Sequence, residues 1–222
     1  MNIINNLISF DKQYNYKYIL GVDEAGRGPG AGDVFAACVC FDLKNKELIQ
    51  NLKKLNDSKK LSQNVRNELY QIIVSNSTYS VNQASVNEID KYNILNATFI
   101  AMAKSVKSVI SQINTVNIND IIILVDGNKK IKNLDLNMHS IIKGDSKSAS
   151  IAAASILAKV SRDNYMIKLD NIYPNYNWKN NKGYLTKEHL NAIDKYGMVK
   201  YHRKSFLKKH FESKSKQLGI FK

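Results

Sequence analysis

The chain has 222 residues, of which 44% are hydrophobic, and it carries a formal net charge of +14. This length suits one buried core with a small appendage, and the apolar content excludes a disordered chain. No apolar run reaches the roughly 18 residues that a membrane span needs, and the amino terminus lacks the features of a signal peptide. The positive charge favours a polyanionic partner, nucleic acid above all, although a solvated basic surface would give the same total.

Both cysteines lie in one apolar run, VFAACVCF, as Cys38 and Cys40. On a strand, residues two apart point to the same face, and that geometry does not suit a disulfide. The spacing does not match a CxxC redox pair either. We expect two small buried side chains with reduced thiols, and hence a cytoplasmic protein.

Apolar runs and turn residues indicate a chain that mixes strands and helices. Five runs predict strands, at residues 18–22, 34–41, 77–86, 121–125 and 138–145. Helical spacing and capping residues predict helices at 62–75, 93–113, 146–169, 188–196 and 204–218. Asp145 or Ser146 is expected to cap the alanine-rich helix, and residues 172–186 are expected to form a loop. This order indicates an α/β protein with a mixed central sheet and a helical C-terminal end.

Four acidic residues adjoin apolar segments, where a core would exclude unpaired charge. They are Asp23 and Glu24 after the first predicted strand, Asp126 at the end of the fourth, and Asp145 before the alanine-rich helix. Gathered at the carboxyl ends of adjacent strands, they would offer the oxygen ligands that Mg²⁺ and Mn²⁺ prefer. Two such ions can stabilise the attacking and leaving oxygens of a phosphodiester. In a basic chain this pocket favours a metal-dependent nuclease, while each residue alone is more often a turn, a cap or a solvated acid.

The glycine-dense segment 26–31, GRGPGA, also fits the loose dinucleotide-binding pattern GxGxxA. That pattern requires a helix directly after the glycines, so that the amino terminus of the helix holds the pyrophosphate. A strand is expected here instead, and the acids before the glycines would repel phosphate in the absence of a metal ion. We therefore reject dinucleotide binding. The histidines form no recognisable metal pattern and are expected on helix surfaces or in loops: His139, His189, His202 and His210.

Several motifs together resemble the ribonuclease HII family of type 2 ribonucleases H. They occur in family order over about residues 17–206: GVDEAGRGP at 21–29, NDSKKLS at 56–62, VDGN at 125–128, KGDSKSASIAAASILAKVSRD at 143–163, YP…KGY…T…H at 173–189 and HRKSF at 202–206. The first and fourth are the most specific. The GRG form resembles this family rather than the related ribonuclease HIII.

The resemblance implies a ribonuclease H-like fold, with a mixed five-stranded central sheet flanked by helices and a helical C-terminal extension. It divides the chain into a catalytic domain over 1–170 and a loop and helical extension over 171–222, packed on that domain. The implied activity is cleavage of RNA in RNA–DNA hybrids and of ribonucleotides embedded in duplex DNA. Cutting on the 5′ side of the ribonucleotide would leave 3′-hydroxyl and 5′-phosphate ends. We expect the enzyme to be a monomer.

Matched motif by motif, the resemblance implies that the catalytic residues, which bind Mg²⁺ or Mn²⁺, are Asp23, Glu24, Asp126 and Asp145. The implied substrate contacts are to the ribose 2′-hydroxyl by Gly26, Arg27 and Gly28, to the sugar at the RNA–DNA junction by Tyr184, and to backbone phosphates by Ser58 and Lys59. Glycines suit this role because they let backbone groups come close to the 2′-hydroxyl that marks RNA. Asp163, in SRD, is interpreted as structural.

Three positions depart from the pattern that is usual in the family. After GRGP the usual continuation is Leu-Ala-Gly-Pro, where this chain has Gly30-Ala31-Gly32-Asp33, and glycine usually follows KGY, where this chain has Leu185. Gly30 is expected to loosen the glycine turn, Asp33 to repel a phosphate and Leu185 to displace Tyr184. We expect activity that is weaker or differs in its preference for single ribonucleotides.

Two other functions stay open from the residues alone. A nucleic-acid-binding protein with an inactive site would bind without metal-dependent cutting. A ribonuclease H-fold enzyme with another task, such as a DNA-strand transferase or a junction resolvase, would not need a 2′-hydroxyl in its substrate. The lysine-rich segment 204–222 suits a phosphate-binding helix or, alternatively, a solvated tail.

Overall fold

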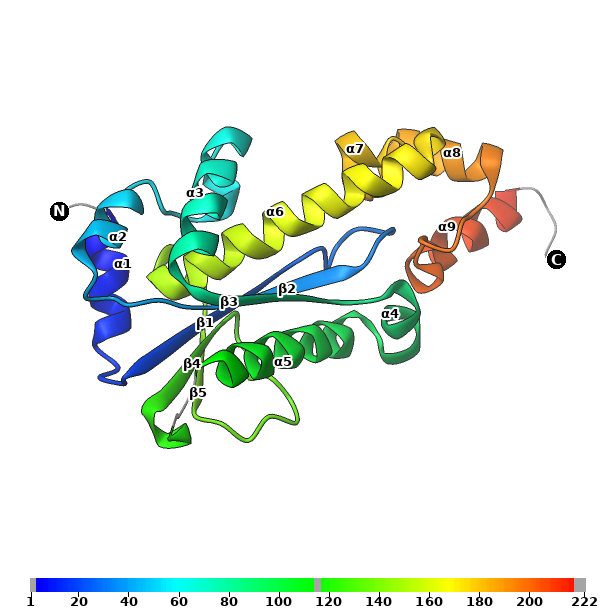
Figure 1. The fold of residues 1–222 in the computed structure, drawn as a ribbon. Coiled ribbons are helices and arrows are strands. Elements are labelled where there is room, and N and C mark those ends of the chain that lie inside the picture. Colours follow the sequence, from blue (N-terminus) through cyan, green and yellow to red (C-terminus); the bar gives the residue numbers. More distant parts are fainter. Residues whose placement is uncertain (1–2, 114–116, 218–222) are drawn as a thin grey trace.

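A five-stranded sheet forms the centre of the computed structural model, which describes residues 3–113 and 117–217 (Figure 1). The strand order is β3-β2-β1-β4-β5. β2 pairs antiparallel with β1 and β3 pairs antiparallel with β2, whereas β4 pairs parallel with β1 and β5 pairs parallel with β4. The strand bounds are β1 (Tyr18–Ala25), β2 (Val34–Cys40), β3 (Thr78–Ala84), β4 (Ile121–Asp126) and β5 (Met138–Ile141). The sheet is therefore mixed, as the sequence predicts.

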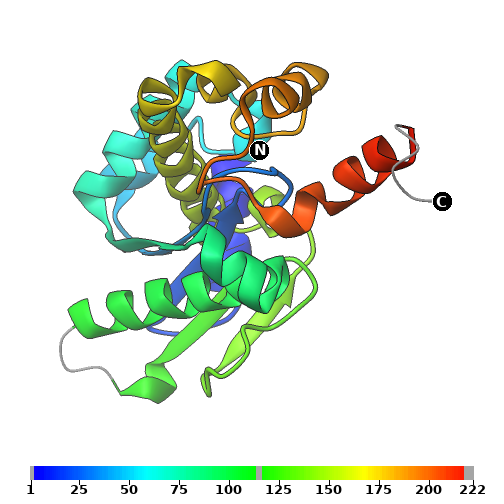
Figure 2. The same ribbon diagram turned by 90° about the vertical axis from the view of Figure 1, so that its right-hand side faces the viewer.

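Helices cover both faces of this sheet (Figures 1 and 2). The long helix α6 packs across one face together with α1 and α3, and α5 packs on the opposite face. The helix bounds are α1 (Ile3–Lys12), α2 (Lys46–Asn51), α3 (Gln63–Asn76), α4 (Val86–Tyr92), α5 (Ile94–Gln112), α6 (Ala149–Ile172), α7 (Trp178–Asn181), α8 (Lys187–Tyr196) and α9 (Lys204–Gln217). None of the described helices is long and apolar enough to cross a membrane.

Small residues let α6 approach the central strand closely. A side chain at Gly21 of β1 would collide with the backbone of Ser150 and Ile151 at the start of α6. The alanines of α6 at positions 152–154 and 158 are fully buried against the sheet. The strands beneath are apolar on both faces, with Val39 packed toward α6 and Cys38 toward α5. The two cysteines are buried and unpaired, as their spacing predicts.

The C-terminal extension packs on the far end of α6. Its residues Trp178, Ile193 and Leu207 form one buried cluster with Met166 and Leu169 of α6. The extension also contacts the glycine-rich connection between β1 and β2, through a bridge between Ala31 and His202. Gly183, Tyr201 and Arg203 of the extension also bond the backbone of the loop that follows the GRG motif.

Several predicted boundaries are wrong, and each has a local cause. β1 continues through Ala25, because it stays paired with β2 up to Phe35, so Asp23 and Glu24 lie within the strand and not after it. Ser148, not Asp145 or Ser146, caps α6 by accepting from the backbone N–H of Ile151. Three helices went unpredicted, α1, α2 and α4, and residues 172–186 contain the short helix α7 instead of only a loop.

Two further boundaries are also shifted at the ends of elements. β5 ends at Ile141, four residues before the predicted end, because Lys143 adopts a left-handed conformation with φ 56° and the chain turns. β3 ends at Ala84 because Ser85 caps α4 in a capping box with Glu88. The predicted end of the last helix at Leu218 lies outside the described residues.

Candidate active site

Two of the predicted carboxylates come from neighbouring parallel strands. Val22 of β1 is paired with Val125 of β4, so the residues that follow, Asp23 and Asp126, lie side by side at the same edge of the sheet. Asp23 is only 5% exposed. The Asp126 carboxylate is half-buried and its Oδ1 accepts a 2.7 Å hydrogen bond from the backbone N–H of Gly144. Strand pairing alone therefore brings two acids together.

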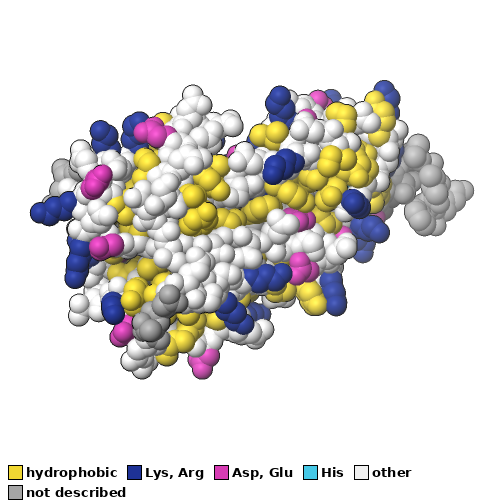
Figure 3. Space-filling model, in the orientation of Figure 1, with side chains coloured by type: hydrophobic (Ala, Val, Ile, Leu, Met, Phe, Trp, Pro, Cys, Tyr) yellow, Lys and Arg dark blue, Asp and Glu magenta, His cyan; other side chains and the backbone are white. Residues whose placement is uncertain are grey.

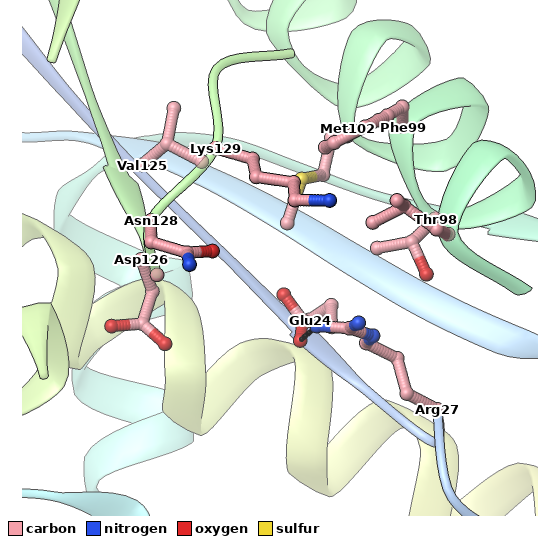
Figure 4. Close-up of a pocket in the computed structure, with 11 residues that line it drawn as sticks. Glu24, Arg27, Thr98, Phe99, Met102, Val125, Asp126, Asn128 and Lys129 are labelled. Carbon is pink, nitrogen blue, oxygen red and sulfur yellow. Dashed lines mark hydrogen bonds and ion pairs between the residues drawn. The ribbon is translucent and has the colours of Figure 1, made fainter. Parts of the chain in front are cut away.

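Glu24 follows Asp23 on β1 and lines a small cavity on the side of α5. Its Oε1 forms an ion pair of 3.3 Å with Nη1 of Arg27. Figure 4 shows Glu24 and Asp126 at one cavity of about 100 Å³, with Phe99 and Met102 of α5 on its far side. The backbone N–H of Glu24 also donates to the neighbouring Asp23 carboxylate at 2.7 Å.

Asp145 reaches the same region from a short 3-10 helix, Gly144–Ser146, between β5 and α6. The hydrogen bond from Gly144 to Asp126 ties this helix to the end of β4. Asp145 is close enough to Asp57 for their carboxyl groups to share a hydrogen bond. The four acids Asp23, Glu24, Asp126 and Asp145 are called the carboxylate cluster below.

The pKa shifts in the carboxylate cluster reflect crowded negative charge. Burial first, and then Glu24 and Asp126, raise the pKa of Asp23 well above its ordinary value. Burial raises the pKa of Glu24 and of Asp145 as well. Burial by itself would lower the pKa of Lys59, but Asp145 and then Asp23 raise it overall. Such shifts mark a site whose acids lack enough positive charge nearby to stay ionised easily.

Carboxylate oxygens and a backbone carbonyl are the donors that hard divalent cations take, and the cluster offers only these. Within the described residues, no three acidic, histidine or cysteine side chains yet converge closely enough to bind one ion together. The donor chemistry fits Mg²⁺ or Mn²⁺.

The predicted substrate-contacting residues line one cavity next to the carboxylates. It has a volume of about 330 Å³, and its walls include Gly26, Arg27, Gly28, Ser58, Lys59 and Tyr184 together with Asp23, Glu24 and Asp126. Asp145 is not part of this wall, although it interacts with Asp126 and Lys59. Residues more than 150 positions apart thus meet at one place.

The Tyr184 ring lies over the glycine turn and is open to solvent. A Cβ atom on Gly28 would stand 3.4 Å from Cε1 of Tyr184, and the tyrosine is 54% exposed. Its carbonyl oxygen lies 2.9 Å from Nδ1 of His189. An exposed ring beside a close-approach backbone is suited to stack on or contact a sugar.

The family model and the similar proteins all point to one family. The family model for Ribonuclease HII matches residues 20–214. A ribonuclease HII of Fusobacterium nucleatum is 47% identical over 214 residues, which cover 96% of this chain and 95% of that protein. A ribonuclease HII of Clostridioides difficile is 47% identical over 94% of this chain and 76% of its own length.

The chain belongs to the ribonuclease HII family. It is therefore a nuclease of the ribonuclease H type, an enzyme that hydrolyses RNA paired with DNA, in a family that depends on divalent metal ions.

Solved structures confirm the ribonuclease H-like fold. The RNase HII in a complex with PCNA from Archaeoglobus fulgidus has a TM-score of 0.66 and 23% identity, covering 84% of this chain and 94% of that one. Ribonuclease H2 from Pyrococcus horikoshii has a TM-score of 0.65 and 24% identity, covering 85% and 93%. A ribonuclease HIII described in complex with Mn²⁺ has a TM-score of 0.65 and 18% identity, covering 81% and 63%.

At two departures from the usual ribonuclease HII pattern, the structure overturns the expected effect. Gly30 is not loosened, because its N–H donates to the carbonyl of Gly183 and its own carbonyl accepts from the N–H of Arg203. Asp33 does not face a phosphate, because it is buried and its Oδ1 accepts from the N–H of Val86 at 3.0 Å.

The third departure, Leu185, packs against the first, Gly30. The place that a side chain on Gly30 would take is filled by Leu185, whose Cγ and Cδ2 stand 2.5 Å from that Cβ position. Leu185 therefore occupies the space next to the glycine turn from the other segment. Tyr184, its neighbour in the chain, still lies on Gly28, so Leu185 does not carry it away from the turn.

Four residues at the ribonuclease HII site had not been predicted. Asp57 contacts Asp145, and Ser155, Lys159 and Arg162 of α6 line the larger cavity. Ser155 bonds the Ser58 hydroxyl at 2.9 Å and also the Asp23 carboxylate. The three helix positions have a readable signal, since spacing of three to four residues places polar side chains on one helix face. Asp57 lies in the NDSKKLS motif, from which only Ser58 and Lys59 were predicted as site residues.

Asp163 and two histidines have structural roles. The Asp163 carboxylate pairs with the ammonium of Lys159 at 2.5 Å on α6, in keeping with its interpretation as structural. The expectation for the histidines is wrong for His189, which is buried within α8; His202 does lie in a connection, the one before α9, but it is also buried, and the Nε2 atoms of the two rings are 3.1 Å apart. Trp178 donates to His189 and the Val199 N–H donates to His202.

Proposed function

We propose that this ribonuclease HII cuts the phosphodiester bond on the 5′ side of a ribonucleotide, leaving a 3′-hydroxyl and a 5′-phosphate. Its substrates would be RNA–DNA hybrids and duplex DNA that carries a single ribonucleotide. The observation that carries the proposal is the single cavity shared by three acids of the carboxylate cluster, the glycine turn 26–28 and Tyr184. In this cavity the acids that would catalyse hydrolysis adjoin the groups that would recognise a ribose.

The carboxylate cluster would hold Mg²⁺ or Mn²⁺. Bound there, the ions would supply an activated water and stabilise the negative charge that develops on the phosphate and the leaving oxygen. The protein's own part is to orient the acids. The Gly144 N–H fixes one oxygen of Asp126, while the Ser155 hydroxyl and the Glu24 N–H bond Asp23.

Phosphate binding is assigned to Ser58 and Lys59. The Ser58 hydroxyl is buried against Ser155, and Lys59 lies within the field of four acids: Asp145, Asp23, Asp57 and Asp126. A lysine so placed stays charged and can hold a backbone phosphate next to the cut. The supporting turn is fixed from α3 by Arg66, whose Nη1 donates to the carbonyl of Ser58 at 2.9 Å.

Ribose recognition is assigned to the glycine turn 26–28 and to Tyr184. Gly28 has no side chain between the turn and the tyrosine ring, so its backbone stays open to contacts that a Cβ atom would hinder. The 2′-hydroxyl is the group that tells RNA from DNA at such a site. All of these groups come from one chain, so a monomer would be sufficient, and the buried thiols suit the cytoplasm.

The test is cleavage of a DNA duplex that carries one ribonucleotide, with Mg²⁺ or Mn²⁺ and with EDTA, beside an all-DNA duplex. We expect metal-dependent cutting on the 5′ side of the ribonucleotide and none in the control. Cutting of the all-DNA duplex would contradict the proposal and favour a resolvase-like enzyme. Binding without cutting in either metal would indicate an inactive binding protein.

A further inference from the structure

The glycine loop, residues 26–33, rests on a buried arginine from the C-terminal extension. The Arg203 side chain is fully buried and donates to three carbonyl oxygens of this loop. Nη2 donates to Gly26 at 2.7 Å, Nη1 to Arg27 at 3.2 Å and Nε to Gly32 at 2.8 Å. One guanidinium thus contacts both ends of the loop.

A second buried arginine, Arg162 of α6, contacts the same loop from the other side. Its Nη2 donates to the carbonyl of Ala31 at 3.2 Å and its Nε to the carbonyl of Asp33 at 3.3 Å. Its side chain also occupies the space that a Cβ atom on Gly26 would need. The two arginine side chains therefore bind five of the loop's eight carbonyl groups.

Asp33 supplies the negative charge that two adjacent buried guanidiniums require. Burial lowers the pKa of Arg203, the nearby Arg162 lowers it further, and Asp33 opposes both. The Asp33 carboxylate also accepts from the Tyr165 hydroxyl and from the N–H of Val86. Its burial at this place explains why an acid is tolerated next to a nucleic-acid site.

The geometry of the peptide bond carries this arrangement to the cavity. In a trans peptide the carbonyl of one residue and the N–H of the next point in opposite directions. Because the carbonyls of Gly26 and Arg27 point at Arg203, the N–H groups of Arg27 and Gly28 point away from it. Arg27 and Gly28 line the cavity, whereas Arg203 does not.

We propose that Arg203, supported by Arg162 and Asp33, is a positioning residue for ribose recognition. It fixes the peptide planes of the glycine turn so that the N–H groups of Arg27 and Gly28 are presented to the substrate. The planar fork of a guanidinium suits three carbonyls at fixed angles, which a single ammonium group cannot match. The inference rests on the proposed function, in which this turn reads the 2′-hydroxyl.

The first experiment tests the positioning in the free protein. Hydrogen exchange of the Gly30 and Gly32 amides, which bond Gly183 and Tyr201, is measured by NMR in wild type and in Arg203→Lys. We expect exchange about tenfold faster in the variant, as for the loss of one charge-assisted hydrogen bond. Ile73→Ala, in the core beneath α3, serves as a destabilised control and should leave these two amides unchanged relative to the rest of the protein.

The second experiment measures discrimination without turnover. Binding to a duplex with one ribonucleotide and to the same all-DNA duplex is compared in EDTA, and the ratio of the two Kd values is the readout. We expect Arg203→Lys to lower this ratio about five- to tenfold, while all-DNA affinity changes less than about twofold because the positive charge is kept. A loss of stability alone, as in Ile73→Ala, would not change the ratio.

Phe206→Leu is the milder variant if Arg203→Lys does not fold. The Phe206 ring lies 5.2 Å from the Arg203 guanidinium carbon, so its loss should loosen the arginine and lower the ratio in the same direction. If the folded variants keep the Kd ratio of the wild-type protein, the role of Arg203 alone is overturned. If the wild-type protein itself gives a Kd ratio of one, ribose recognition by this turn is overturned, and with it this inference.

Discussion

Asp126 accepts a structural hydrogen bond and also carries the negative charge that a metal ligand needs. A single substitution separates these two roles. Its Oδ1 accepts from Gly144, which an asparagine oxygen can still do, but the negative charge is lost. We expect Asp126→Asn to fold normally, to bind nucleic acid within about threefold of wild type and to cut at least about 100-fold more slowly. Single-turnover cleavage and binding in EDTA measure both effects.

Asp135→Asn is the matched control, because Asp135 is an exposed acid outside both cavities at the site. It should retain wild-type cleavage and binding. Turnover that persists in Asp126→Asn, with the control also active, would refute Asp126 as a ligand.

Gly30 and Leu185 give a second test at single residues, because the Leu185 side chain fills the space that Gly30 leaves free. Gly30→Leu should destabilise the fold by about 1–3 kcal/mol, since the new side chain would enter the space of Leu185. Adding Leu185→Gly should recover much of that loss, with a coupling energy of about 1–3 kcal/mol. Urea unfolding of the two single variants and the double variant gives this coupling. Additive effects would mean that the two positions are independent.

Between elements, the buried histidine pair joins α8 to the segment before α9 and supports Tyr184. Trp178 donates to Nε2 of His189, so the proton of that ring sits on Nδ1 and is donated to the Tyr184 carbonyl. The Val199 N–H donates to Nδ1 of His202, so Nε2 of His202 donates to His189. Both rings must be neutral for every one of these contacts to be made.

This network predicts acid sensitivity with a defined sign. Burial, and then His189, lower the pKa of His202 to about 4 from an ordinary value of 6.5, and burial lowers that of His189 although Tyr184 and Glu188 oppose it. Between these pH values the unfolded chain binds a proton that the folded chain refuses. The contribution of the neutral histidine pair to the free energy of unfolding is therefore full above pH 6.5. It is lost as pH falls toward 4, by up to about 3 kcal/mol.

The measurement is the free energy of unfolding between pH 4 and 7. His202→Gln should flatten this slope, because a glutamine carries no proton in that range. His210→Gln is the control, since His210 is a surface residue paired with Asp194. Equal slopes in wild type and His202→Gln would show that the pair does not titrate as described.

The sequence predicted the sheet better than the small helices, for a physical reason. β2 and β4 are buried on both faces and appear as continuous apolar runs, which few other structures produce. α1 buries Ile4, Leu7, Ile8 and Asp11, a helical spacing that was readable but interrupted by asparagines. The capping box of α4, Ser85 to Glu88, was present in the sequence but overlapped the predicted third strand.

At the scale of the whole molecule, the motifs located the site but not its supports. Parallel pairing of β1 and β4 brings Asp23 and Asp126 together at the ends of two strands that the sequence predicted. The contact of Asp57 with Asp145, and of Arg203 with the glycine loop, depends on how distant segments pack. No local pattern in one sequence encodes such packing, so these residues were not predicted.

The distribution of charge bears on how the protein meets its substrate. Figure 3 shows Lys and Arg side chains scattered over one face, at its ends and between them, and not in a single patch. With a net charge of +14, nucleic-acid affinity should fall about a hundredfold between 50 and 200 mM salt, as for about four neutralised phosphates. Titration of binding against salt in EDTA gives the slope.

The location of the charge, and not only its total, should decide that slope. α9 begins directly after Arg203, which contacts the glycine loop, and its first half carries the exposed Lys204 and Lys209. Replacing both with glutamine should lower the slope by about two, one for each lost phosphate contact. Replacing Lys12 and Lys17, near the opposite end of β1 from the carboxylates, removes the same charge and should leave the slope nearly unchanged. Equal losses from both pairs would mean that α9 acts only through net charge and does not contact the nucleic acid.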